Sequence, residues 1–191
     1  MVSQVMSETL VSYEDYLAAE EKSELKHEWL DGMIYAMSRG TPEHARLSAN
    51  VTSALRTTFK GVCSVYSSDA MLFVRETGLS TYADASITCG SVETHRVVKN
   101  GRALGEAITN PAVIVEILSE ATQDYDRGEK FGHYMRIPSL KEYVLVAQDE
   151  ARVEVFRRPI GGGHWTRNVA MAGQTITLHD RTIAVDEIYG K

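Results

Sequence analysis

Two acidic residues and one lysine could together form a hydrolytic site in this chain. The first, Glu116, interrupts the otherwise apolar run Ala112–Leu118, and such a run is typical of a buried strand. An ionised carboxylate left unpaired there would cost several kcal/mol. Glu116 must therefore be neutralised by a proton, a basic side chain or a metal ion.

Lys130 is a candidate partner for Glu116. Asp126 can cap a helix from about Arg127 to Arg136, and on this helix Lys130 lies one turn before the apolar Tyr134. The path from strand through loop to helix can bring Lys130 over the end of the strand that carries Glu116. Tyr134 is expected to pack in the core with its hydroxyl free to touch the site.

Asp84 supplies a second carboxylate, at the start of a short predicted strand, Asp84–Thr88. Two carboxylates with water can hold a hard divalent cation such as Mg²⁺. That cation would polarise a phosphate oxygen and lower the pKa of a bound water. A lysine beside it could orient the water or offset charge on the phosphorus. These residue types favour metal-dependent hydrolysis of phosphodiesters.

The same residues also have purely structural explanations. Glu116 could be a protonated core residue, or one paired with Lys130, without any enzymatic role. Asp84 could be an ordinary strand-end or turn residue. Ser119 could be a nucleophile on paper, but no histidine is placed to activate it, and a capping or turn role is favoured.

The surrounding elements alternate between helices and strands. Asp31-Gly32 indicates a hairpin over 27–37, and residues 78–82 are expected to be loop. Helices are predicted over 12–21, 42–60 and 127–136, and strands over 62–67, 70–75, 84–88, 112–118, 142–147, 152–158, 165–170 and 175–179. This order favours a single mixed α/β or α+β domain over residues 1–191, with one central sheet and a frayed segment 1–9.

Residues 90–110 form a long connection without clear periodicity. Connections of that length are usually functional or mobile. This one carries Arg96, Lys99 and Arg102, which are candidates for contacts with DNA phosphates, although the same cations could belong to an ordinary solvated loop.

Composition bounds the class of protein. The chain has 191 residues and a net charge of −6, so any contact with nucleic acid must come from local patches. No apolar run is long enough to span a membrane and no signal peptide is present, so a cytoplasmic protein without membrane contact is expected.

Cys63 and Cys89 fit no metal-site spacing and are expected to be free and partly buried. Walker, dinucleotide-binding, HExxH and GxSxG motifs are absent.

The motifs around these residues resemble a known family. The segments that carry the resemblance are Asp84, Val115-Glu116-Ile117-Leu118-Ser119, Asp124 to Lys130 with Tyr134, and Ile137 to Val146. Together they are similar to the Uma-type family of bacterial endonucleases, a former domain of unknown function in the PD-(D/E)XK superfamily. The likeness runs from about Tyr13 to about Trp165 and is densest from Val115 to Val146.

The resemblance implies a restriction-endonuclease-like fold, in which helices flank a mixed sheet. The short strands predicted near the C-terminus are expected to be extra antiparallel elements of this fold. It also implies that Asp84, Glu116 and the backbone carbonyl of Ile117 bind Mg²⁺ or Mn²⁺. Lys130 would be the catalytic lysine, and DNA the substrate.

Two further residues at the start of the chain fit the family. Glu28 would be an accessory acid, although an acid in a hairpin could simply be solvated or paired. His44 could take part in catalysis, although a histidine in such a position is more often a hydrogen-bonded core residue.

Two positions depart from the superfamily pattern. Ala83 replaces the proline that precedes the first acid, which alters backbone stiffness more than chemistry. Leu118 replaces the lysine that follows the second acid, so the lysine role would fall to Lys130 on the next helix.

Two other classes of function stay open beside a nuclease. One is a nucleic-acid-binding module whose catalytic site has decayed, which Leu118 and the acidic net charge favour. The other is an interaction protein that forms a homodimer through its antiparallel C-terminal strands.

Overall fold

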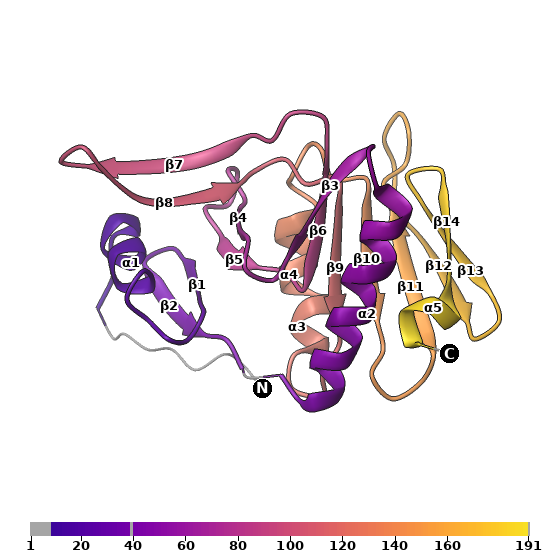
Figure 1. Ribbon diagram of the computed structural model, residues 1–191. Coiled ribbons are helices and arrows are strands. Elements are labelled where there is room, and N and C mark those ends of the chain that lie inside the picture. The colour runs from indigo at the N-terminus through magenta and orange to yellow at the C-terminus, as the bar shows by residue number, and fades with distance from the viewer. Residues whose placement is uncertain (1–8, 39, 191) are drawn as a thin grey trace.

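The computed structural model describes residues 9–38 and 40–190. Its strands form two six-stranded sheets and a separate two-stranded hairpin, with helices against the sheets (Figure 1). The expected mixed α/β class with extra C-terminal antiparallel strands is confirmed. No helix in the described ranges is both long and apolar enough to cross a membrane.

The central sheet has the strand order β12-β11-β10-β9-β6-β3. Strands β9 and β10 are parallel, and all other neighbours in this sheet are antiparallel. Its strands are β3 (Cys63–Ser67), β6 (Ala85–Cys89), β9 (Val113–Ile117), β10 (Glu142–Val146), β11 (Arg152–Arg157) and β12 (Thr166–Met171). β12 forms one edge of the sheet, and a dimer through the C-terminal strands stays a prediction.

Alternation along β9 directs its side chains to two different cores. Val113, Val115 and Ile117 pack in the core beneath the helix α2 (Pro42–Phe59). Ile114 packs in the second core, which lies against the helix α4 (Glu129–Tyr134). Glu116 follows the same alternation and therefore faces α4. This confirms the two faces that the sequence predicts for the strand.

The helix α2 begins as its sequence predicts. The Thr41 side chain accepts a hydrogen bond from the backbone N–H of His44, and Pro42 occupies the first turn. Its buried stripe covers one face of the sheet, together with α5 (Val185–Tyr189) and the hairpin of β13 (Thr175–Leu178) and β14 (Arg181–Ala184). The sequence did not predict β14 or α5.

The second sheet has the order β2-β1-β5-β4-β8-β7. Its strands are β1 (His27–Leu30), β2 (Met33–Ala36), β4 (Met71–Phe73), β5 (Ser80–Tyr82), β7 (Thr94–Lys99) and β8 (Arg102–Ile108), with α1 (Tyr13–Glu20) beside it. The turn between β1 and β2 is built from Asp31 and Gly32, both with positive φ, as a tight hairpin requires. This hairpin carries Glu28.

The structure differs from several expectations. One sheet is expected, but a second sheet of six strands accompanies the central one. Residues 78–82 are not all loop, because 80–82 form β5 between β1 and β4. The long connection 90–110 is largely the hairpin β7–β8. The helix expected over 127–136 is only α4, and a separate helix, α3 (Gln123–Arg127), precedes it with Gly128 between them. Its proposed cap, Asp126, lies inside α3 instead.

Contrary to expectation, the two cysteines are not free. Cys63 and Cys89 are joined by a disulfide, with their Cα atoms 4.4 Å apart. They lie directly opposite each other on the antiparallel strands β3 and β6. Twenty-six residues separate them in the chain, so only the pairing of these strands reveals that they can bridge.

Candidate active site

The two candidate metal-binding carboxylates meet where β6 pairs with β9. Ala85 is opposite Val115 in this antiparallel pair, which places Asp84 beside Glu116. The backbone N–H of Asp84 donates to Glu116 Oε2 at 3.4 Å. The backbone N–H of Ile117 donates to Asp84 Oδ2 at 2.7 Å. Residues 32 positions apart in the chain therefore share one site.

The backbone of Ile117 also turns toward Asp84. In a strand, the N–H and C=O of one residue point to the same side. Because the N–H of Ile117 is bonded to Asp84, its carbonyl is directed to the β6 side as well. The neighbouring Leu118 instead donates to Val146, on the β10 side.

Lys130 reaches the same place from the first turn of α4. Its Nζ lies 3.1 Å from Glu116 Oε1 and 3.1 Å from Glu28 Oε1. It also donates to the backbone carbonyl of Tyr82 at 3.2 Å. The lysine is thus fixed by contacts from β1, β5 and β9, which all approach one end of α4.

Glu28 is held on β1 by hydroxyl groups as well as by Lys130. The Thr81 hydroxyl donates to Glu28 Oε1, and the Tyr125 hydroxyl donates to Oε2 at 2.9 Å. Glu28 is therefore a paired acid, which is one of the alternatives to a functional role. Its partner Lys130 also contacts Glu116, so both acids belong to the same cluster.

Asp126 is a fourth carboxylate, and the sequence assigned it only a capping role. Its Oδ1 lies 3.8 Å from Lys130 Nζ, one helical turn along the chain. Glu28, Glu116, Asp126 and Lys130 are each only 4% exposed. The four-residue spacing between Asp126 and Lys130 could have indicated this contact, whereas Thr81 and Tyr125 could not have been found from spacing.

Tyr134 packs in the core as expected and its hydroxyl does reach the site. The side chain is fully buried, and its hydroxyl donates to Glu116 Oε1 at 2.9 Å. Glu116 thus has one oxygen bonded to Lys130 and Tyr134, while its other oxygen faces the backbone of Asp84.

Burial and charge shift the ionisation of this cluster. Burial raises the pKa of Glu116 to about 8, although Lys130 opposes the rise. Burial alone would lower the pKa of Lys130, but Glu116 and Glu28 together raise it well above its usual range. Burial also raises the pKa of Asp126. The site therefore attracts positive charge, whether from protons or from a cation.

The free energy of unfolding should fall as pH rises through the range in which Glu116 ionises. In an unfolded chain the pKa of Glu116 would be about 4.3, against about 8 in the fold. Between these values the fold keeps a proton that the unfolded chain releases, so the free energy of unfolding drops by up to about 1.4 kcal/mol per pH unit. Lys130 adds no slope here because it stays protonated in both states.

Urea unfolding at several pH values in that interval checks this expectation, and Mg²⁺ should restore stability at the alkaline end. Glu116→Gln should flatten the pH dependence. Because the raised pKa values of His44 and Asp126 add slopes of the same sign, the variant is compared with the parent protein at each pH. Identical slopes in the two proteins would contradict the assignment to Glu116.

His44 lies at the more exposed side of the cluster. Its Nε2 is 3.2 Å from Asp84 Oδ2, and the two side chains are 21% and 15% exposed. The hydrogen bond to Asp84 raises the pKa of His44, although burial opposes the rise. Solvent therefore reaches the site at Asp84 and His44, while Lys130 and Glu28 lie behind them.

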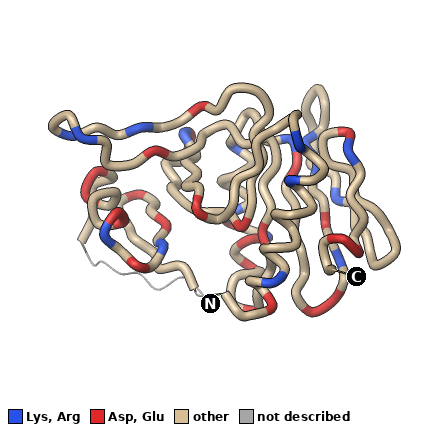
Figure 2. The backbone as a smooth tube through the Cα atoms, in the orientation of Figure 1, with Lys and Arg blue, Asp and Glu red and all other residues tan. Residues whose placement is uncertain are grey.

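The candidate DNA contacts lie on a different part of the molecule. Lys and Arg residues follow the β7–β8 hairpin, which projects beyond the central sheet over α1 (Figure 2). Lys99 pairs with Glu14 at 3.2 Å and Arg102 pairs with Glu21 at 2.5 Å. Arg96 is exposed. None of the three contacts the cluster around Lys130 in the described residues.

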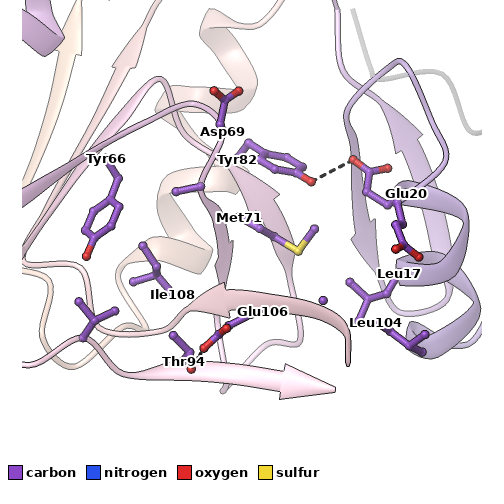
Figure 3. Close-up of a pocket in the computed structure, with 14 residues that line it drawn as sticks. Leu17, Glu20, Tyr66, Asp69, Met71, Tyr82, Thr94, Leu104, Glu106 and Ile108 are labelled. Carbon is purple, nitrogen blue, oxygen red and sulfur yellow. Dashed lines mark hydrogen bonds between the residues drawn. The ribbon is translucent and has the colours of Figure 1, made fainter. Parts of the chain in front are cut away.

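A pocket of about 480 Å³ lies between α1, β4 and β8 (Figure 3). Tyr82 connects it with the cluster, because its hydroxyl donates to Glu20 in the pocket while its carbonyl accepts from Lys130. Its acidic lining residues are Glu20, Glu21, Asp69 and Glu106. An acidic pocket does not favour a phosphate group, so the candidate active site is placed at Asp84, Glu116 and Lys130.

Comparisons with known proteins identify the family of this chain. The family model Uma2, described as "Putative restriction endonuclease", matches residues 13–184. The uncharacterised protein slr1290 of Synechocystis sp. is 32% identical over 182 residues, covering 94% of this chain and 91% of that protein. The uncharacterised protein sll1609 of the same organism is 29% identical over 162 residues, covering 84% and 88%.

A solved structure is similar in fold. It is described as a putative nuclease belonging to DUF820 from Anabaena variabilis, and it covers 88% of this chain and 92% of its own with a TM-score of 0.68. Its sequence identity is 16%, so the likeness concerns the fold. It confirms the restriction-endonuclease-like architecture that the sequence motifs implied.

Proposed function

Because this chain belongs to the Uma2 family, we propose that it is a metal-dependent endonuclease that hydrolyses phosphodiester bonds of DNA. The family match and the nuclease fold support a nuclease. The substrate, the metal and the residue roles proposed here rest on the cluster itself.

One observation carries the proposal, namely the surplus of buried carboxylates around one ammonium. Glu28, Glu116 and Asp126 all lie within 3.8 Å of Lys130 Nζ, and Asp84 lies beside Glu116. A core that needed only a neutral ion pair would contain one carboxylate. The excess of acidic groups, which protons neutralise in part while burial raises the pKa of Glu116 and Asp126, suits a site that takes up a cation.

The donor atoms fit a hard divalent cation. Asp84 and Glu116 offer carboxylate oxygens, and the Ile117 carbonyl is directed to the same side. The backbone of Ile117 and the ring of His44 both contact Oδ2 of Asp84, so we assign Oδ1 to the ion. Oxygen ligands of this kind suit Mg²⁺ or Mn²⁺. When bound, the cation would activate water and polarise the phosphate.

The remaining residues would position charge around the reacting phosphate. Lys130, kept protonated by its carboxylate neighbours, would offset negative charge that develops in the transition state. Glu28, Tyr125 and Thr81 would hold the lysine in place. His44, on the solvent side of Asp84, would give a proton to the leaving oxygen.

Incubation with supercoiled plasmid DNA tests the proposal. With Mg²⁺ or Mn²⁺ the protein should convert the plasmid to nicked and linear forms, and a chelator should stop the conversion. Linear duplex and single-stranded DNA would define the preferred form. If none of these is cleaved with either metal, the protein is not an active DNA endonuclease.

A second candidate function is a nucleic-acid-binding protein with a decayed site. Lys130 is bonded to both Glu28 and Glu116 and is almost fully buried, and Leu118 stands at the usual lysine position. Salt-dependent binding of DNA without cleavage would favour this alternative over the endonuclease.

The hairpin cations provide a separate prediction about DNA binding. Neutralising Arg96, Lys99 and Arg102 together should weaken DNA binding. The slope of the logarithm of the binding constant against the logarithm of the salt concentration should fall in magnitude by about one for each phosphate that the hairpin no longer neutralises. Most of the effect should come from Arg96, since the other two already pair with acids of the α1 region. Cleavage of bound DNA should change little.

Fluorescence anisotropy over a salt series measures this effect. A variant with Arg56, Lys60 and Lys141 neutralised is a matched control, because it removes the same charge from exposed positions elsewhere. Equal reductions of affinity in the two triple variants would show that the hairpin is not a DNA-binding element.

A further inference from the structure

Outside the nuclease site, the sulfur atoms of Cys63 and Cys89 lie beside a histidine. Their Sγ atoms and a ring nitrogen of His179 all lie within 4.8 Å of one another, so the three residues could together hold a metal ion. Cys63 and Cys89 are paired across β3 and β6, and His179 follows β13. Three separate segments thus direct soft ligands to one point.

The backbone at His179 holds the ring in place by an unusual conformation. His179 and Asp180 form the two-residue turn between β13 and β14, since Leu178 is paired with Arg181. Both have positive φ, 45° and 64°, where asparagine and glycine are the favoured residues. Such a conformation in histidine is uncommon, and it persists only where surrounding structure fixes it.

The turn is fixed by hydrogen bonds to Glu142 of the central sheet. The backbone N–H of His179 donates to both oxygens of the buried Glu142, at 3.3 and 3.0 Å. Arg157 holds the same carboxylate and also donates to the carbonyl of Thr177. The turn is therefore fixed above the sheet face on which the two cysteines pack.

We propose that Cys63, Cys89 and His179 form a redox-controlled zinc site, distinct from the nuclease site. In the oxidised protein the two sulfurs form a disulfide and cannot bind the metal as thiolates. A dithiol reductant would supply two electrons and two protons, break the S–S bond and leave two thiols, while the reductant itself becomes a disulfide. Zinc would then bind, and the thiols would release their protons as thiolates.

The ligand chemistry and spacing suit zinc. Two thiolates and one imidazole are the soft and intermediate ligands that zinc prefers. With bonds of about 2.3 Å to sulfur and about 2.0 Å to nitrogen, tetrahedral ligands lie roughly 3.5 to 3.8 Å apart. Opening the disulfide lets the sulfurs separate toward that spacing. The fourth position would be taken by water, and the bound ion would fasten the β13–β14 hairpin to β3 and β6.

Cobalt(II), added to the full-length protein under anaerobic conditions, is the probe. Protein reduced with dithiothreitol and then desalted should develop thiolate-to-cobalt absorption in the near ultraviolet, which zinc then removes. Oxidised protein should show no such band. Because only sulfur ligands produce it, cobalt at the carboxylates of the nuclease site does not interfere.

The histidine is tested by a variant that keeps both cysteines. His179→Ala should lower cobalt affinity at least about tenfold, whereas His164→Ala, at an exposed histidine outside the cluster, should not. Cys63→Ser should remove most of the band. Absence of the band in reduced parent protein would overturn the proposal, and so would equal affinities of the two histidine variants.

Discussion

Replacing Glu116 by glutamine should abolish metal-dependent cleavage of DNA while leaving the fold intact. Burial raises the pKa of Glu116 to about 8, so a neutral amide resembles the state of this side chain in the metal-free protein. Glutamine also keeps an oxygen that can accept from Tyr134. It lacks the negative charge that a divalent cation requires, so the cleavage rate should fall by at least about a hundredfold.

Asp84→Asn should have the same effect on cleavage, since an amide oxygen can still accept from Ile117 but carries no charge. Single-turnover cleavage of plasmid DNA measures both variants, with circular dichroism and urea unfolding to confirm the fold. Glu120→Gln is the matched control, because it makes the same substitution at an exposed acid close by in the chain. Cleavage by Glu116→Gln at the parent rate would remove Glu116 from the proposed machinery.

Replacing Lys130 by methionine should have the largest effect on stability. Methionine retains most of the apolar stem of lysine but leaves Glu28, Glu116 and Asp126 buried without their shared cation. Removing one partner of a buried ion pair typically destabilises a protein by about 3–5 kcal/mol. Cleavage should also be abolished, and Lys130→Arg should not restore it fully, because a planar guanidinium cannot replace a compact ammonium.

Urea unfolding near neutral pH and near pH 5 separates the two roles of Lys130. The destabilisation should shrink at the lower pH, because the unpaired carboxylates become protonated there. Adding Glu28→Gln and Glu116→Gln to Lys130→Met should recover stability without recovering cleavage. Lys141→Met, at an exposed position, is the control. A Lys130→Met protein as stable as the parent at both pH values would show that the lysine does not hold this cluster together.

Local patterns predicted the parts of the site that depend on neighbouring residues. The period of two along β9 places Glu116 on the α4 face, and the spacing of Lys130 and Tyr134 places both on the buried side of α4. The helix predicted over 42–60 corresponds to α2, which carries His44. Each of these follows from a few consecutive residues.

Other contacts depend on pairings between distant segments, which no local pattern encodes. β5 is only three residues long, too short to give a strand signal, yet it brings Thr81 to Glu28. The disulfide depends on the register of β3 with β6. Asp126 was assigned as a helix cap because an acid before a helical stripe usually is one. Gly128 instead divides that region into two helices, and Asp126 turns inward toward Lys130.

The location of bound manganese tests the central claim most directly. Crystals of the protein grown with Mn²⁺ would show the ion by anomalous scattering. We expect one peak within roughly 2.1 Å of carboxylate oxygens of both Asp84 and Glu116, on the side where the Ile117 carbonyl is directed. A peak bound by neither residue, or no peak at manganese concentrations that support cleavage, would contradict the proposed site.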